Sequence, residues 1–107
     1  MSFCDKLQAA LTALAVPVFH FTATQQSGDY IVWSEDGAGD ALCGNGGRLL
    51  VPVSGTVDLF IRSLDDADTA EAVETALASV TPAWELTSIQ YERDTGYKHY
   101  EWQWEGI

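Results

Sequence analysis

Basic residues are scarce in this sequence. Five Lys and Arg residues stand against 16 Asp and Glu residues, which gives a formal net charge of −11 at pH 7. A surface this negative repels phosphate, so the composition argues against tight binding of nucleic acid and against attraction to an anionic membrane. The same acidity is typical of simple solubility, and it also suits a protein past which DNA must move without adhering. Composition leaves these two interpretations open.

Long hydrophobic runs are also missing. No segment approaches the ~20 consecutive apolar residues that span a bilayer. Residues 7–18 are largely apolar and resemble the core of a secretory signal. Against that interpretation, Asp5 cancels the charge of Lys6, and Gln8 interrupts the run at helical spacing. We therefore expect no contact with a membrane.

Residues for catalysis and metal binding are few and dispersed. Cys4 and Cys43 are the only cysteines, and His20 and His99 are the only histidines. The two cysteines could pair, but their spacing does not require a disulfide, and two isolated cysteines are also typical of buried thiols in a reducing cytosol. No Cys-x-x-Cys pair is present to nucleate a metal site, and no Gly-x-Ser-x-Gly motif to mark a nucleophile. We expect no catalytic residue, metal or cofactor, with His20 on the alternate face of a strand and His99 in solvent.

Two amphipathic helices are indicated. The chain has 107 residues, 47% of them apolar, which predicts a single domain over residues 1–107. The first helix begins at Ser2 and stops at Pro17, and the second is capped by Asp68 and stops at Pro82. Helical spacing predicts their buried stripes, which are Phe3, Leu7, Ala10, Leu11 and Leu14 in the first helix and Ala70, Val73, Leu77 and Val80 in the second.

Strand composition recurs in six segments. They cover residues 18–22, 30–34, 48–53, 56–62, 84–91 and 97–105. Ser54-Gly55 separates two of these segments, and Gly96 is predicted to be the left-handed residue of a hairpin turn. In residues 84–91 the apolar phase changes near Thr87-Ser88, which indicates a β-bulge.

These elements predict an α+β fold. In the order α-β-β-β-β-α-β-β, the economical arrangement is two layers: a mostly antiparallel sheet of four to six strands with both helices on one face. The other face of the sheet is then open. Period two places Tyr100, Trp102 and Trp104 on one side of the last strand, either in the core or on that open face.

Glycine is concentrated in one place. Five of the nine glycines lie in residues 36–47, which we expect to form a flexible loop. A phosphate-binding loop would open a helix, whereas this segment leads into the strand composition of residues 48–53.

The second half of the chain resembles a known family. The resemblance lies in Tyr-Ile-Val-Trp at 30–33, Gly-Thr-Val-Asp-Leu-Phe at 55–60, the acidic helix, Trp-Glu-Leu at 84–86, Ile-Gln-Tyr-Glu at 89–92 and Gly-Tyr-Lys-His-Tyr-Glu-Trp at 96–102. It covers roughly residues 30–105 and is similar to the small tail-completion proteins of long-tailed bacteriophages and prophages, the tail-terminator and head–tail joining group. The Gly-rich segment departs from that pattern, which leaves its contacts open.

The resemblance implies a structural virion protein. It implies a ring of this chain, often a hexamer, at the head-proximal end of the tail, with the tail-tube protein and head connector as partners. Assembly would take place in the host cytoplasm, and DNA would pass an acidic lumen without tight binding. Candidate contacts with another copy or a partner are Asp36, Gly37, Gly39, Asp40, Asn45, Arg48, Trp102 and Trp104. Two alternatives stay open: a small-ligand-binding or regulatory domain with the Gly-rich loop as its lid, and an enzyme that uses Cys43.

Overall fold

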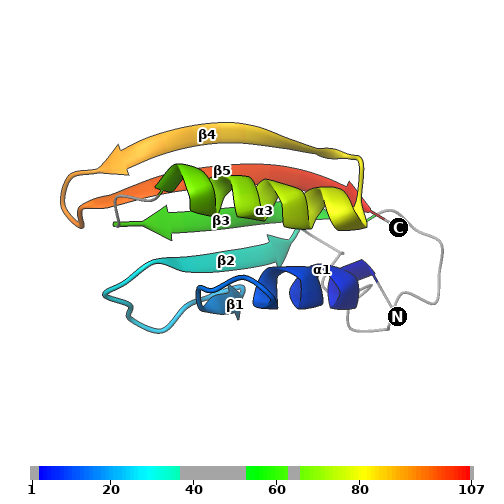
Figure 1. Cartoon of the computed structure of the whole chain (residues 1–107), viewed down its shortest axis with the longest axis horizontal. Helices are drawn as coiled ribbons and strands as arrows, with labels where there is room; N and C mark the ends of the chain where they lie inside the picture. Colours follow the sequence, from blue (N-terminus) through cyan, green and yellow to red (C-terminus); the bar gives the residue numbers. More distant parts are fainter. Residues whose placement is uncertain (1–2, 37–52, 63–65, 107) are drawn as a thin grey trace.

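The computed structural model describes residues 3–36, 53–62 and 66–106. The elements are α1 (Phe3–Thr12), β1 (Val18–His20), β2 (Tyr30–Glu35), β3 (Val53–Ile61), α3 (Asp66–Val80), β4 (Trp84–Glu92) and β5 (Tyr97–Gly106). The strands form one five-stranded sheet in the order β1-β2-β3-β5-β4. β1 is parallel to β2, and the other neighbours are antiparallel. Figure 1 shows both helices on the same side of this sheet, so the predicted α+β class is confirmed.

The core lies between the helices and the sheet. Leu7 and Leu11 of α1 and Leu77 of α3 are fully buried there, so both predicted apolar stripes are confirmed. Trp102 is the largest fully buried side chain, and its indole N–H donates to Glu74 Oε2 of α3 over 2.9 Å. That hydrogen bond satisfies the one polar atom that the buried indole carries and ties α3 to β5.

The starts and ends of several elements differ from expectation. α3 begins at Asp66, so Asp68 lies inside the helix rather than at its cap. α1 ends at Thr12, well before Pro17, and the Thr12 hydroxyl donates back to the Gln8 carbonyl. A threonine that bonds back in this way weakens and bends the end of a helix. None of the described helices is long and apolar enough to span a membrane.

β1 is shorter than predicted because the backbone reverses at Phe21. This residue has φ 72°, and the Thr22 N–H donates to the His20 carbonyl over 3.0 Å. The hydrogen bond spans two residues around a positive φ, which defines a tight γ-turn of the strained kind. The strand therefore ends at His20, not at residue 22.

The predicted break between strands at Ser54-Gly55 is wrong, since both residues lie inside β3. A Cβ at Gly55 would meet the Ser34 carbonyl and would lie 2.6 Å from Trp104 Cζ2. Glycine is needed here because β2 and an indole approach the backbone closely, and not because the chain turns. The strand predicted over residues 48–53 lies outside the described residues except for Val53, which belongs to β3.

The C-terminal hairpin agrees with the sequence in detail. The β4–β5 register shifts between Leu86 and Ser88, which confirms the bulge. Gly96 has φ 78° in the connecting turn, as predicted. Trp102 and Trp104 face the helices, so the aromatic stripe lies in the core and not on the open face.

Candidate functional site on the open face of the sheet

The open face of the sheet is acidic. Because side chains alternate along a strand, the residues of β5 between its buried aromatic residues project away from the helices, and the register places their partners from β3 and β4 beside them. The carboxylates that the strands place on this face are Asp58, Glu85, Glu92, Glu101 and Glu105. The described strand residues on this face include no Lys or Arg. Five of the 16 acidic residues of the chain therefore share this one face.

A histidine lies at the centre of these carboxylates. His99 Nε2 is 2.8 Å from Asp58 Oδ1, and His99 Nδ1 is 3.6 Å from Glu92 Oε2. Asp58 is directly opposite Glu101 across the β3–β5 ladder. The hydrogen bond with Asp58 raises the pKa of His99 above its ordinary value, and partial burial opposes the shift. The side chain is only 19% exposed, so the expectation of a solvated His99 is wrong.

Two threonines orient the carboxylates of this group. The Thr56 hydroxyl donates to Asp58 Oδ2 over 3.3 Å, and the Thr87 hydroxyl lies 3.1 Å from Glu101 Oε2. Thr87 is the extra residue of the bulge in β4. Asp58 thus contacts Thr56 through Oδ2 and His99 through Oδ1, while Thr87 contacts one of the two side-chain oxygens of Glu101.

Aromatic rings border the acidic group. Phe60 stacks on His99 with ring centroids 4.3 Å apart and on Tyr30 with centroids 4.7 Å apart. Tyr97 meets both Phe60 and Tyr30 edge-on, and the Arg62 guanidinium lies 4.3 Å from the Tyr97 ring centroid. These contacts hold the His99 ring in one orientation and exclude water from one of its faces.

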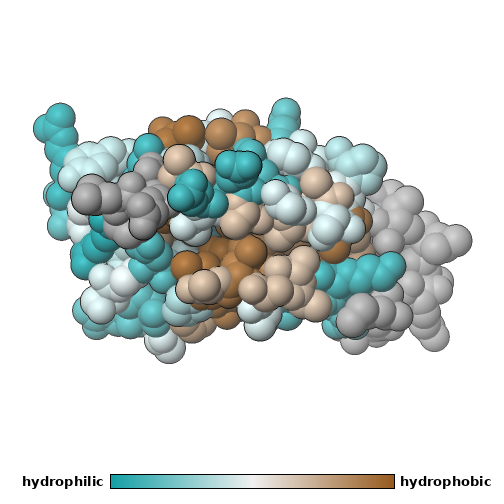
Figure 2. Space-filling model, in the orientation of Figure 1, coloured by the Kyte–Doolittle hydropathy of each residue, from teal (hydrophilic) through white to brown (hydrophobic). Residues whose placement is uncertain are grey.

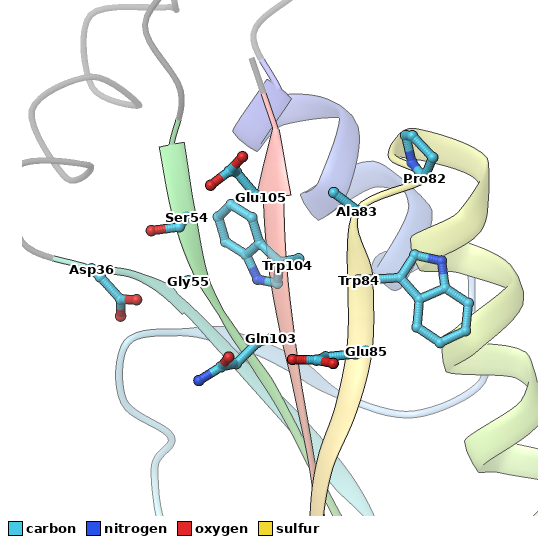
Figure 3. Close-up of a pocket in the computed structure, with 10 residues that line it drawn as sticks. All are labelled: Asp36, Ser54, Gly55, Pro82, Ala83, Trp84, Glu85, Gln103, Trp104 and Glu105. Carbon is cyan, nitrogen blue, oxygen red and sulfur yellow. The ribbon is translucent and has the colours of Figure 1, made fainter.

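A shallow pocket of roughly 450 Å³ lies where the strands end, close to Pro82. Figure 3 shows the side chains around it, which include the carboxylates of Asp36, Glu85 and Glu105. No described lining residue is cationic. Three carboxylates without a counter-ion favour a positively charged occupant.

A second group lies at the helix side of the sheet. The carboxylate of Glu35 is fully buried, and its Oε1 is 2.5 Å from His20 Nε2. The imidazole stacks on Trp33 and on Phe21, with ring centroids 4.0 Å and 4.3 Å apart. Phe21 is the central residue of the γ-turn, so this turn places its ring against His20. Cys4 Sγ lies 3.9 Å from Glu35 Oε2. Sequence reasoning missed Glu35 because it ends a strand that otherwise reads as apolar.

Cys4 is buried as expected, but it is not a reduced thiol. It is bonded in a disulfide, which is one of the two states that the sequence leaves open. Cys43, the other cysteine of the chain, lies outside the described residues. A sulfur held in a disulfide is not a thiolate nucleophile, so Cys4 does not form a catalytic pair with His20.

The outer edge of the sheet carries exposed apolar side chains. Leu86, Ile89 and Tyr91 of β4 are 40%, 50% and 68% exposed. β5 is the only neighbour of β4 in the sheet formed by the described residues. Figure 2 shows hydrophobic surface along the upper edge of the molecule, where β4 runs in Figure 1. We call these three side chains the β4 ridge.

The contact residues predicted from sequence are mostly not brought together. Trp102 and Trp104 are 0% and 2% exposed, so they are core residues and cannot serve as contacts in this fold. Asp36 is exposed and lines the pocket. The others lie outside the described residues, together with the rest of the Gly-rich segment: Gly37, Gly39, Asp40, Asn45 and Arg48.

Comparison with known proteins adds no family to this picture. No protein-family model matches the sequence, and no curated protein is significantly similar to it. Function is therefore inferred from the residues and their geometry.

Proposed function

We propose that this chain is a structural, non-catalytic virion protein of a long-tailed phage or prophage that completes the tail at its head-proximal end. It forms a ring of identical copies that joins the tail tube to the head connector. The β4 ridge, on a strand whose outer edge pairs with no other strand among the described residues, is the structural observation that supports assembly, and the place in the virion is what the resemblance of residues 30–105 implies. Large exposed apolar side chains beside free backbone N–H and C=O groups are typical of a surface that pairs with another chain.

The β4 strand suits contact between copies that are all strongly acidic. Its apolar residues Leu86, Ile89 and Tyr91 share the helix side, while Glu85 and Glu92 project to the open face. Two copies can therefore bury the ridge without bringing these carboxylates into the same interface. A ring requires each copy to place this edge against a different patch of its neighbour, which is a heterologous contact.

The acidic open face supports the same role. A ring that turns this face inward presents Asp58, Glu101 and the neighbouring carboxylates to its lumen. Like charge keeps DNA from adhering as it passes. The disulfide of Cys4 is also more typical of a particle released into oxidising surroundings than of a protein that stays in the cytosol.

Substitution on the ridge tests the assembly. Ile89→Lys places a charge in the centre of the proposed interface, and Gln90→Lys makes a charge change on the opposite face of the same strand. We expect the unmodified chain and Gln90→Lys to form rings, and Ile89→Lys to stay monomeric with an unchanged circular dichroism spectrum. Light scattering gives the mass, and electron microscopy shows whether the particles are closed rings.

Two results would contradict the proposal. One is a chain that remains monomeric at high protein concentration, and the other is an Ile89→Lys variant that assembles as the unmodified chain does. Because Ile89 is half exposed, its replacement should not unfold the monomer, and loss of assembly can be assigned to the interface.

The pocket near Pro82 supports one alternative, a small-ligand-binding or regulatory domain. Its carboxylates favour a cationic metabolite such as a polyamine or an amino sugar. A panel of such compounds should then raise the melting temperature, and Glu85→Gln should reduce the shift. A panel without effect removes this alternative and leaves the assembly role untouched.

A further inference from the structure

Strands β3 and β5 bring three metal-ligating side chains together on the open face. Asp58 comes from β3, and His99 and Glu101 come from β5. One potential ligand atom of each lies within 4.8 Å of the other two. We propose that these residues form a binding site for one divalent transition-metal ion of the zinc type. None of its ligands belongs to the β4 ridge, so metal binding can be tested apart from ring formation, although Asp58 and Glu101 also belong to the face that the proposed ring turns toward its lumen.

The distances suit a small ion after a slight adjustment. Two ligands at about 2.1 Å from a metal are separated by roughly 3.0–3.4 Å at octahedral to tetrahedral angles. His99 Nε2 and Asp58 Oδ1 are already 2.8 Å apart. Movements of well under 1 Å at this pair, with a rotation of the longer Glu101 side chain, accommodate the ion without moving either strand.

Each ligand has a neighbour at an atom other than the one proposed to bind the ion. Thr56 donates to Asp58 Oδ2, and the ion would replace the hydrogen bond that joins Asp58 Oδ1 to His99 Nε2. Thr87 holds Glu101 through Oε2. A metal-bound histidine is normally oriented by a carboxylate on its other ring nitrogen, and Glu92 lies 3.6 Å from His99 Nδ1.

Electrostatics also favours a cation at this position. Asp58 and Glu101 are directly opposite across the ladder, and like charges in that arrangement destabilise a sheet. A proton on His99 offsets part of the repulsion. A divalent ion offsets more of it, because it carries two charges and replaces the proton on Nε2. Metal and proton therefore compete for the same nitrogen atom, and binding should weaken at acid pH.

The donor set selects the class of ion. Magnesium and calcium prefer ligand shells made entirely of oxygen, whereas an imidazole nitrogen with two carboxylates suits zinc, cobalt or nickel. Three protein ligands leave at least one coordination position for water or for a group from a partner. The site lies on an uncovered face, so such a group can reach the ion.

Calorimetric titration of the untagged, chelator-treated chain with Zn²⁺ tests the site. We expect one equivalent to bind to the unmodified chain. Removing an orienting partner of a metal ligand typically weakens binding 10–100-fold, which sets the effect expected for Glu92→Gln. Removing a ligand with His99→Gln or Asp58→Asn should weaken binding further. Mg²⁺ should compete poorly.

Two control variants separate this site from general attraction to an acidic protein. His20→Gln removes the only other histidine, and Glu105→Gln removes one charge from the same face of the same strand. Both should bind Zn²⁺ as the unmodified chain does. With only two histidines, nitrogen NMR of the imidazoles can also report directly whether His99 Nε2 shifts on titration.

Several results would overturn the site. They are binding that does not saturate, a His99→Gln variant with unchanged affinity, a Glu105→Gln variant weakened as much as the ligand variants, or a metal-induced shift at His20 instead of His99. If His99→Gln loses its fold, the nitrogen shifts of the unmodified chain still decide the question.

Discussion

The two sides of β5 differ completely although they belong to one strand. On the helix side, Tyr100, Trp102 and Trp104 are almost fully buried in the core. On the open side, His99 and Glu101 take part in a group of charges that remains accessible to ions. Alternation along the strand thus separates the residues that stabilise the fold from those available for chemistry. Changes on one side should leave the other side almost unaffected.

Removing Trp102, on the helix side, should lower the unfolding free energy more than any other change proposed here. Trp102→Ala deletes the largest fully buried side chain and leaves Glu74 without its indole partner. Replacing a buried Trp by Ala typically costs roughly 3–5 kcal/mol of unfolding free energy. Gln103→Ala, one residue on and exposed on the opposite side, should change the unfolding free energy by less than about 0.5 kcal/mol. Urea denaturation measures both, and similar losses would contradict the separation of the two sides.

Adding a side chain at Gly55, on the same side of the sheet, should lower the unfolding free energy by an intermediate amount. A Cβ there meets the backbone of β2 and the ring of Trp104, so Gly55→Ala forces the strands or the indole to move. Overpacking of this kind typically costs about 1–3 kcal/mol. Gly28→Ala is the control, because a Cβ at Gly28 has no neighbour within 4 Å. Equal midpoints for the two variants in urea would show that Gly55 is not crowded.

Titration of His99, which lies on the open side, should change the stability of the fold least of the three. The folded pKa of His99 is raised, mainly by its hydrogen bond with Asp58. Its stabilising effect is therefore fully present below the ordinary pKa of about 6.5 and is lost as pH rises through the higher folded value. In chelator, the melting temperature of the unmodified chain relative to His99→Gln should fall across that interval. A difference that stays constant with pH would contradict the role given to Asp58.

Local patterns were enough to predict much of the fold. The stripe through Leu7 and Leu11, the bulge beside Thr87 and the left-handed turn at Gly96 each depend on a few neighbouring residues, and all three are present. The α+β class follows from the order of such elements, because two amphipathic helices need one face of a sheet.

Features that depend on distant residues were not predictable. Ser54-Gly55 reads locally as a break between strands, and only the approach of Trp104 explains the glycine inside a strand. Alternation divides β5 into two faces but does not say which face the helices cover. The sequence therefore leaves Trp102 either in the core or on the open face. The pairing of Asp58 with Glu101 depends on the register of β3 against β5, and a single sequence carries no direct signal of that register.

The bulge at Thr87 divides β4 into two halves whose pairing with β5 differs by one residue. Before it, Leu86 is opposite Trp102, and after it Ile89 is opposite Tyr100, so both face the helix side. Thr87 is the extra residue, so deleting it would make the ladder regular and leave Ser88 opposite Glu101 and Ile89 opposite Tyr100. Loss of this one residue should therefore keep the ridge and the charges on their own faces, although it removes the hydroxyl that holds Glu101. Over evolutionary time a change of one residue in the length of this strand should be tolerated at the bulge, whereas elsewhere in the strand it would move every following side chain to the other face.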